Sequence, residues 1–164
     1  MKRIMTVFLV VVVVGVGVLL LIGPMSPDAP EPQPIEKSTV DVSSDLDILL
    51  PLAESGDAEA QTTLGVKYRV GIGVAQDHDE EFKWFSKAAA QGYAKAQNHL
   101  ALCYSNGFGV PKDAAEAVKW YHKAAAQGLA LAEFNLGVCY RDGDGVPKDE
   151  AESKKWFAKA REKR

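Results

Sequence analysis

Hydrophobic positions in the second half of the chain follow a helical spacing. In the segment 94–105, Ala96, Leu100 and Tyr104 stand at positions i, i+4 and i+8, which places apolar side chains on one face of a helix. Glycines then end this helix, and a second helix begins at Asp113 with Glu116 three residues later. An aspartate at this place accepts hydrogen bonds from unpaired backbone amides, and the glutamate can reach back to the cap. The pattern predicts two helices joined by a short turn.

The predicted helix pair recurs every 36 residues without insertion or deletion. Leucine, tyrosine and Gly-x-Gly-Val positions share this interval with three tryptophans, Trp84, Trp120 and Trp156. Such a period predicts an all-α solenoid, in which each unit buries its apolar face by stacking on its neighbours. The three repeats are assigned to residues 57–92, 93–128 and 129–164.

Both ends of the repeat region differ from the middle. Residues 45–56 align with a second helix alone, so they predict a capping helix, or half repeat. At the other end, Ala160-Arg161-Glu162-Lys163-Arg164 replaces the Ala-Ala-Ala-Gln-Gly of the earlier units. The outer face of the last unit is therefore expected to be polar, as terminal repeats require.

A long apolar run, Ile4–Ile22, follows Lys2 and Arg3. As a helix, its 19 residues would be about 28 Å long, close to the thickness of a bilayer core of about 30 Å. Residues 1–22 are thus predicted to form a single-pass transmembrane signal-anchor. A cleaved signal peptide is the alternative, although prolines occupy the places where its cleavage site would lie.

The flanking charges predict the orientation of this anchor. Cations stay in the cytoplasm, and on the far side of the run the next cation is Lys37. The N-terminus is therefore expected in the cytoplasm and the repeats outside the cytoplasmic (inner) membrane, in the periplasm of a Gram-negative source. Residues 23–44 carry five prolines among small and acidic residues, which predicts a disordered, semi-rigid linker.

The chemistry of the repeats does not favour catalysis or metal binding. From Asp45 onward the chain is close to neutral, so it lacks the basic face that binds nucleic acid. His99 and Cys103 are four residues apart, but no further ligand pattern accompanies them, and Asp142 to Gly145 is interpreted as a turn rather than a calcium loop. Cys103 and Cys139 lie one period apart, too far for a disulfide between neighbouring helices. No cofactor, metal, catalytic residue or small-molecule substrate is expected.

The motifs of the repeat resemble those of the Sel1-like repeats, relatives of the tetratricopeptide repeats. The resemblance rests on Ala-x-x-x-Leu-Gly-x-x-Tyr, Gly-x-Gly-Val, a tryptophan and Lys-Ala-Ala-x-x-Gly in this order over residues 57–164. It implies a right-handed superhelix with a concave groove that binds protein or peptide partners, and it does not identify the partner.

Groove positions of helical-pair repeats, carried over to this chain, give a candidate binding face on the three first helices. An aliphatic row, made of Val66, Leu102 and Val138, runs along this face. The alternative is that this row only packs between neighbouring first helices. The predicted function is a non-enzymatic, membrane-tethered scaffold; a soluble exported protein, acting as a secreted factor, inhibitor or immunity-type partner, is the alternative. The candidate residues are Thr62, Val66, Arg69, Asn98, Leu102, Ser105, Phe134, Val138 and Arg141.

Overall fold

The computed structural model describes residues 12–13, 18–19 and 42–162, and the chain divides into two compact units, 1–38 and 39–164. In the first unit, strand β1 (Val12–Val13) pairs antiparallel with β2 (Val18–Leu19). The helix expected across the apolar run is therefore wrong at these four residues, whose aliphatic and mostly β-branched side chains suit a strand. The remainder of the run and residues 23–41 of the linker lie outside the described residues. No helix in the described part of the chain is long and apolar enough to cross a membrane.

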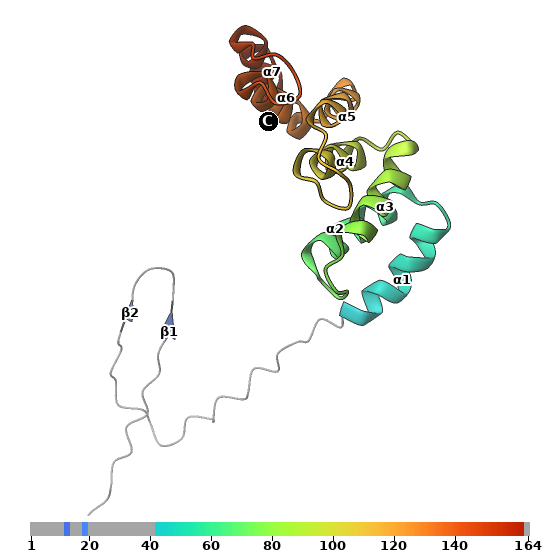
Figure 1. Ribbon diagram of the computed structural model, residues 1–164. Coiled ribbons are helices and arrows are strands. Elements are labelled where there is room, and N and C mark those ends of the chain that lie inside the picture. Colours follow the sequence, from blue (N-terminus) through green and yellow to red (C-terminus); the bar gives the residue numbers. More distant parts are fainter. Residues whose placement is uncertain (1–11, 14–17, 20–41, 163–164) are drawn as a thin grey trace, which may run out of the picture. The chain divides into compact units, whose positions relative to one another are not determined.

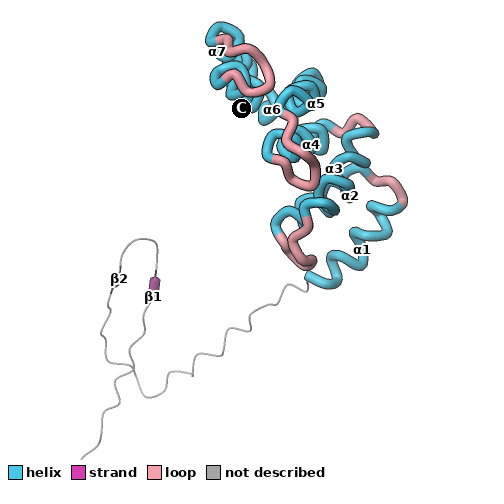
Figure 2. Tube along the Cα trace, viewed as in Figure 1, coloured by secondary structure: helices cyan, strands magenta, loops and turns pink. Residues whose placement is uncertain are grey.

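The second unit is all-helical over residues 42–162, as the spacing predicts (Figures 1 and 2). Each helix has 13 residues and packs on the next along the chain, and α2 also contacts α4. The first helix begins at Val42, inside the segment expected as linker. The helices are α1 (Val42–Glu54), α2 (Ala58–Val70), α3 (His78–Ala90), α4 (Ala94–Asn106), α5 (Ala114–Ala126), α6 (Ala130–Asp142) and α7 (Glu150–Glu162).

Aspartates cap the second helix of every pair. Asp77 accepts hydrogen bonds from the amides of Asp79 and Glu80 at 2.9 and 3.0 Å, and Asp113 accepts one from Glu116 at 2.9 Å. The glutamate of the expected box does not complete it. In all three units its carboxylate pairs instead with a lysine three residues later, at Lys83, Lys119 and Lys155. An i, i+3 partner on the same exposed helix face competes successfully with the cap.

Glycine ends the first helix of every pair in the left-handed conformation. Gly107 has φ of 80°, and its amide donates to the carbonyl of Cys103. Gly71 has φ of 76°, and its amide donates to the carbonyl of Lys67. Gly143 has φ of 78°, and its amide donates to the carbonyl of Cys139. A side chain would resist this backbone conformation, so the glycines fix the place where the chain turns toward the second helix.

The core lies between the two helices of each pair and continues into the next pair. Leu64, Leu100 and Leu136 are buried at equal places in the three first helices. The ring of Phe85 would lie 2.7 Å from a Cβ atom at Gly65, so the missing side chain lets α3 approach α2 closely. The same contact joins Phe157 to Gly137 in the last pair.

A repeated amide contact also connects the ends of the helices. The Gln91 side chain donates to Gln61 Oε1 at 2.8 Å, and one repeat later Gln127 donates to Gln97 Oε1 at 2.8 Å. The side chain of Gln61 donates in turn to the Ala53 carbonyl. We call this set the glutamine ladder. Gln61 thereby links α1 to α2, and Gln97 donates to the Ala89 carbonyl of the preceding repeat at 3.4 Å, so the ladder also connects the first two repeats.

Candidate functional site

Two of the nine candidate residues are buried, so the expectation that they are exposed is wrong. Thr62 is 6% exposed and Asn98 is 4% exposed. Asn98 Oδ1 accepts a hydrogen bond of 3.0 Å from the side chain of Asn135 on the next first helix. Asn98 thus contacts the next first helix, whereas Thr62 donates to the Ala58 carbonyl of its own helix at 2.7 Å. Neither residue can meet a partner without opening the stack.

The aliphatic row divides in the same way. Val66 packs against the core cluster built from α3 and α4, and Leu102 packs against the cluster built from α4, α5 and α6. For these two residues the structure agrees with the alternative interpretation, packing between neighbouring repeats. Val138, the third member of the row, is half-buried on α6.

The candidates at the ends of the first helices remain accessible. Arg69 and Ser105 are half-buried, and Arg141 is exposed, where its guanidinium forms two hydrogen bonds of 2.7 and 2.8 Å with Asp142. Arg69 lies over the ring of Phe85 and approaches His99 Nδ1 at 3.1 Å. Burial, followed by the charge of Arg69, lowers the pKa of His99 to about 4. The imidazole is therefore neutral near pH 7, so that Nδ1 can accept a hydrogen bond from Arg69 and hold the guanidinium in place.

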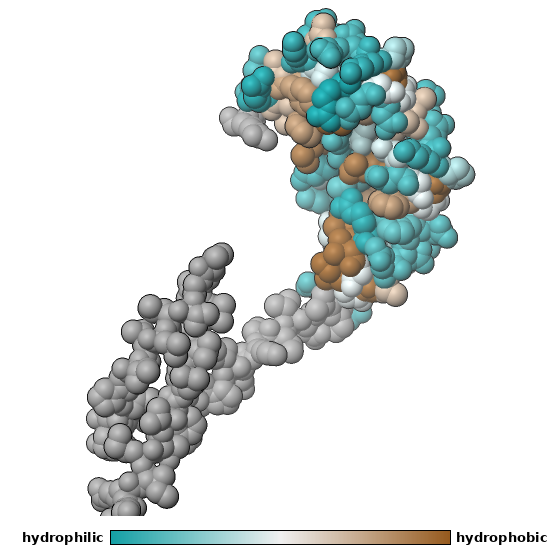
Figure 3. All heavy atoms as spheres, turned by 60° about the vertical axis from the view of Figure 1, so that its left-hand side comes forward, coloured by the Kyte–Doolittle hydropathy of each residue, from teal (hydrophilic) through white to brown (hydrophobic). Residues whose placement is uncertain are grey.

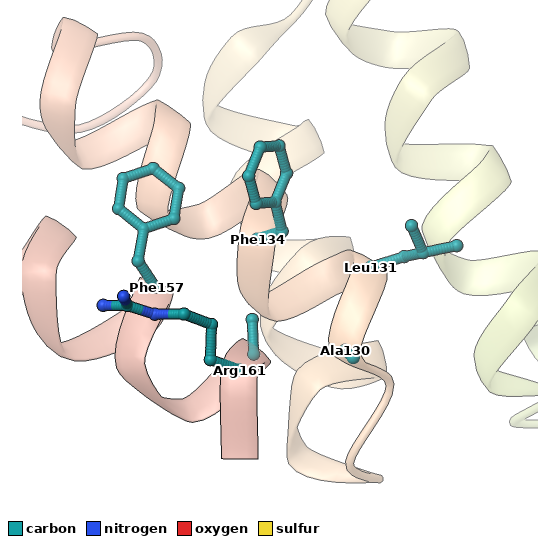
Figure 4. A pocket seen from close by; sticks show the side chains of 6 residues that line it. Ala130, Leu131, Phe134, Phe157 and Arg161 are labelled. Atoms are coloured by element: carbon teal, nitrogen blue, oxygen red, sulfur yellow. The ribbon is translucent and has the colours of Figure 1, made fainter. Parts of the chain in front are cut away.

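The last candidate, Phe134, borders a pocket of about 760 Å³ between α6 and α7 (Figure 4). Its ring lies 5.3 Å from that of Phe157, centroid to centroid. Phe134 is 48% exposed and Leu131 is 64% exposed, so the expected polar outer face of the last unit is only partly correct. Arg161 is the polar residue on this part of the outer face. The pocket is lined by Ala130, Leu131, Phe134, Phe157, Ala160 and Arg161.

The sequence carries a signal for this pocket on a second helix, away from the first helices that hold the candidate residues. Phe157 occupies the same place as Phe85 and Tyr121, and both of these are buried against the following repeat. In the third repeat no described helix follows α7 to cover this place, and Phe157 is half-buried. The alignment of Phe157 with its two buried counterparts therefore points to an uncovered apolar surface, which the groove positions alone did not indicate.

The residues considered for metal binding have other contacts. Cys103 Sγ donates toward Glu81 Oε1 at 3.6 Å, whereas His99 faces Arg69. Among the described residues, no three histidine, cysteine or carboxylate side chains gather in a way that could hold an ion. Both cysteines are free thiols. Burial raises the pKa of Cys103 to about 12 and that of Cys139 to about 11, so both remain protonated and unreactive near pH 7.

Comparison with protein families decides the identity of the repeat. The Sel1 repeat family matches residues 58–93, 94–129 and 130–163, more than half of the chain. The chain is a Sel1 repeat protein. Sel1 repeat proteins are generally scaffolds for protein–protein interactions. The matched repeats begin one residue after the units assigned from the periodicity.

Solved Sel1 repeat structures show the same fold. This Sel1 repeat protein is 50% identical to c5321, described as a protective antigen present in uropathogenic Escherichia coli strains, with a TM-score of 0.69. A Sel1 repeat protein from Oxalobacter formigenes is 38% identical, with a TM-score of 0.68. The matches cover 72% and 73% of this chain but only 25% and 49% of those proteins. Helicobacter pylori cysteine rich protein B is 25% identical, with a TM-score of 0.57, over 76% of this chain and 91% of its own. None of the curated proteins compared matches the chain.

Proposed function

We propose that this Sel1 repeat protein is a non-enzymatic scaffold that binds a protein or peptide through the ends of its first helices. The observation that carries this proposal is the recurrence of accessible side chains at one repeat position, in Arg69, Ser105 and Arg141. These residues lie near the C-terminal ends of α2, α4 and α6, so a partner that contacts all three extends along the stack. We call them the helix-end row.

The chemistry of the helix-end row favours a partner with acidic groups and a few apolar anchors. Arg69 and Arg141 place a cation at each end of the row, and Val138 and Phe134 add accessible apolar surface on α6. Arginine is frequent among residues that dominate binding energy, because it combines charge with a planar surface. The contacts of Arg69 with His99 and Phe85 fix one of these guanidinium groups before binding, which reduces the entropy lost on association.

Replacing Ser105 and Arg141 together with glutamate is expected to reduce partner capture by about tenfold or more, because the row then repels acidic groups. The measurement is affinity capture from a membrane extract with the full-length protein, quantified by mass spectrometry. A matched control carries glutamate at Lys119 and Ala126, two exposed residues of α5. The control is expected to capture the same proteins as the wild type. If the helix-end variant keeps its helical content and melting temperature and still captures them, the row does not form the binding surface.

The same proposal includes a tether, formed by residues 1–22, that holds the repeats outside the cytoplasmic membrane. It is supported by the apolar composition of Ile4–Ile22, of which the strands β1 and β2 cover four residues, and by the cations that precede the run. The description of the relative c5321 as a protective antigen agrees with such a location, since a protective antigen has to be met by the immune system.

Protease added to intact spheroplasts is expected to digest the repeats, while a fragment containing residues 1–22 stays in the membrane fraction. A cytoplasmic marker protein serves as the control for intact membranes. Protection of the repeats until lysis would contradict the orientation. Release of the whole repeat domain into the medium before protease is added would favour the soluble exported protein.

A further inference from the structure

In the earlier repeats, the surface that corresponds to the α6–α7 pocket packs against the first helix of the next repeat. Tyr121 stands at the place of Phe157 and packs in a cluster that includes Ala132 and Leu136 of the next first helix. Asn98 stands at the place of Phe134 and is buried against the same helix. In the last described repeat this stacking surface stays accessible and remains apolar.

A second apolar surface lies on α1, at the opposite end of the helical unit 39–164. One face of this helix packs on α2 through Ala53, which is fully buried. The other face bears Ile48, 67% exposed, and Leu52, 49% exposed, with exposed Pro51 beside them. Ile48 and Leu52 are four residues apart and therefore point the same way. In the space-filling view, hydrophobic atoms are visible toward both ends of this unit (Figure 3).

The two surfaces carry opposite charges. Helix α1 contains Asp45, Asp47 and Glu54 and has no lysine or arginine between Val42 and Glu54. The α6–α7 pocket has Arg161 as the charged residue of its lining, and the last turn of α7 also holds Lys159 and Glu162. Pairing two pockets would bring Arg161 against Arg161, and pairing two α1 helices would bring aspartates together. Joining α1 to the pocket places unlike charges in contact.

We propose that α1 of a second copy of this chain docks in the α6–α7 pocket, so that copies associate head to tail. Ile48 and Leu52 enter between Leu131, Phe134 and Phe157, and the acidic side chains of α1 face Arg161. The incoming helix covers the apolar surface that the next first helix covers in the earlier repeats, although α1 itself corresponds to a second helix. Such a contact is heterologous, and each added copy leaves one α1 and one pocket open for another.

Complementation between two variants tests this arrangement. Ile48→Asp disables α1 and Leu131→Asp disables the pocket; both sites are highly exposed, so the fold should tolerate the changes. Full-length copies with two different affinity tags are mixed in detergent micelles at about 100 µM, where even weak contacts of this kind form. Wild-type copies are expected to capture each other and to sediment as species larger than dimers. Each variant is expected not to capture a copy of itself.

Mixing the two variants is expected to restore capture, because one copy retains its pocket and the other its α1. The product should stop at a dimer, since its free α1 and its free pocket are both disabled. Capture of one Ile48→Asp copy by another at the wild-type level would overturn the proposal, and so would monomeric wild-type protein. In a second measurement, Arg161→Glu is expected to weaken wild-type capture severalfold and added Asp47→Lys to restore it. Failure of that rescue, with both variants folded by circular dichroism, would contradict the charge pairing.

Discussion

Replacing Phe85 with alanine is expected to lower the free energy of unfolding by about 3–5 kcal/mol. The Phe85 side chain is fully buried, fills the space left by Gly65 and belongs to the cluster that joins α3 to α4. Its removal leaves a cavity inside one pair and also weakens the contact with the next. Because a small domain has a total stability of about 5–15 kcal/mol, a large part of the array should lose its structure under mild denaturant. The measurement is urea denaturation followed by far-ultraviolet circular dichroism.

Phe134→Ala is the matched control for this prediction. It removes the same group from a side chain that is 48% exposed and lies on the accessible surface of α6. We expect it to cost less than about 1 kcal/mol, because most of the lost area was already in contact with water. Similar losses for Phe85→Ala and Phe134→Ala would show that burial at the repeat interface does not dominate stability.

Gly109→Ala is expected to be comparably damaging, at about 3–5 kcal/mol, through the backbone rather than through a cavity. Gly109 has φ of 66°, and a Cβ atom there would overlap the carbonyl group of His78 in the preceding repeat and lie 2.8 Å from Phe82 Cβ. The turn of one repeat touches the start of the second helix of the repeat before it, so the chain has to move for a methyl group to fit. Thermal denaturation of the variant should show the loss.

Gly92→Ala separates the two causes of this loss. Gly92 also has a positive φ, 86°, but a Cβ atom there would meet nothing within 4 Å. Only the strain of the left-handed backbone remains, so the expected cost is about 1 kcal/mol. If the two alanine variants melt at the same temperature, then close approach of the repeats contributes nothing at Gly109.

Features that depend on neighbouring residues in the chain were predictable from the sequence. The apolar spacing predicts the helices of residues 45–162, the aspartates predict the caps of the second helices, and Gly107 predicts a left-handed helix end. Each of these depends on groups within four residues of one another, so no knowledge of the tertiary arrangement is needed. The expected hydrogen bond from the N-cap amide to the glutamate of the capping box is the exception, because Glu116 has an equally local partner in Lys119.

The candidate site was less predictable because it depends on the register between repeats. Thr62 and Asn98 are polar, and from the sequence they were expected to face solvent, yet both are buried, and Asn98 bonds Asn135 of the next first helix. Leu102 is half-buried beside the cluster that includes α6 of the next repeat. The rotation that relates one helix pair to the next decides which face of a first helix is covered, and no local rule gives that rotation.

The glutamine ladder distinguishes the third repeat from the first two, although the three repeats are similar in sequence. A primary amide both donates and accepts, so Gln61 and Gln97 can each receive a hydrogen bond from one neighbour and pass another to a carbonyl. The same place in the third repeat holds the buried Glu133, and a carboxylate can only accept. In the first two repeats this hydrogen bond runs back to a carbonyl of the preceding unit, at Ala53 or Ala89, so a carboxylate at Glu133 cannot donate to the second repeat in the same way. A duplicated first or second unit would therefore keep this hydrogen bond to the unit before it, whereas a duplicated third unit would contact its predecessor differently.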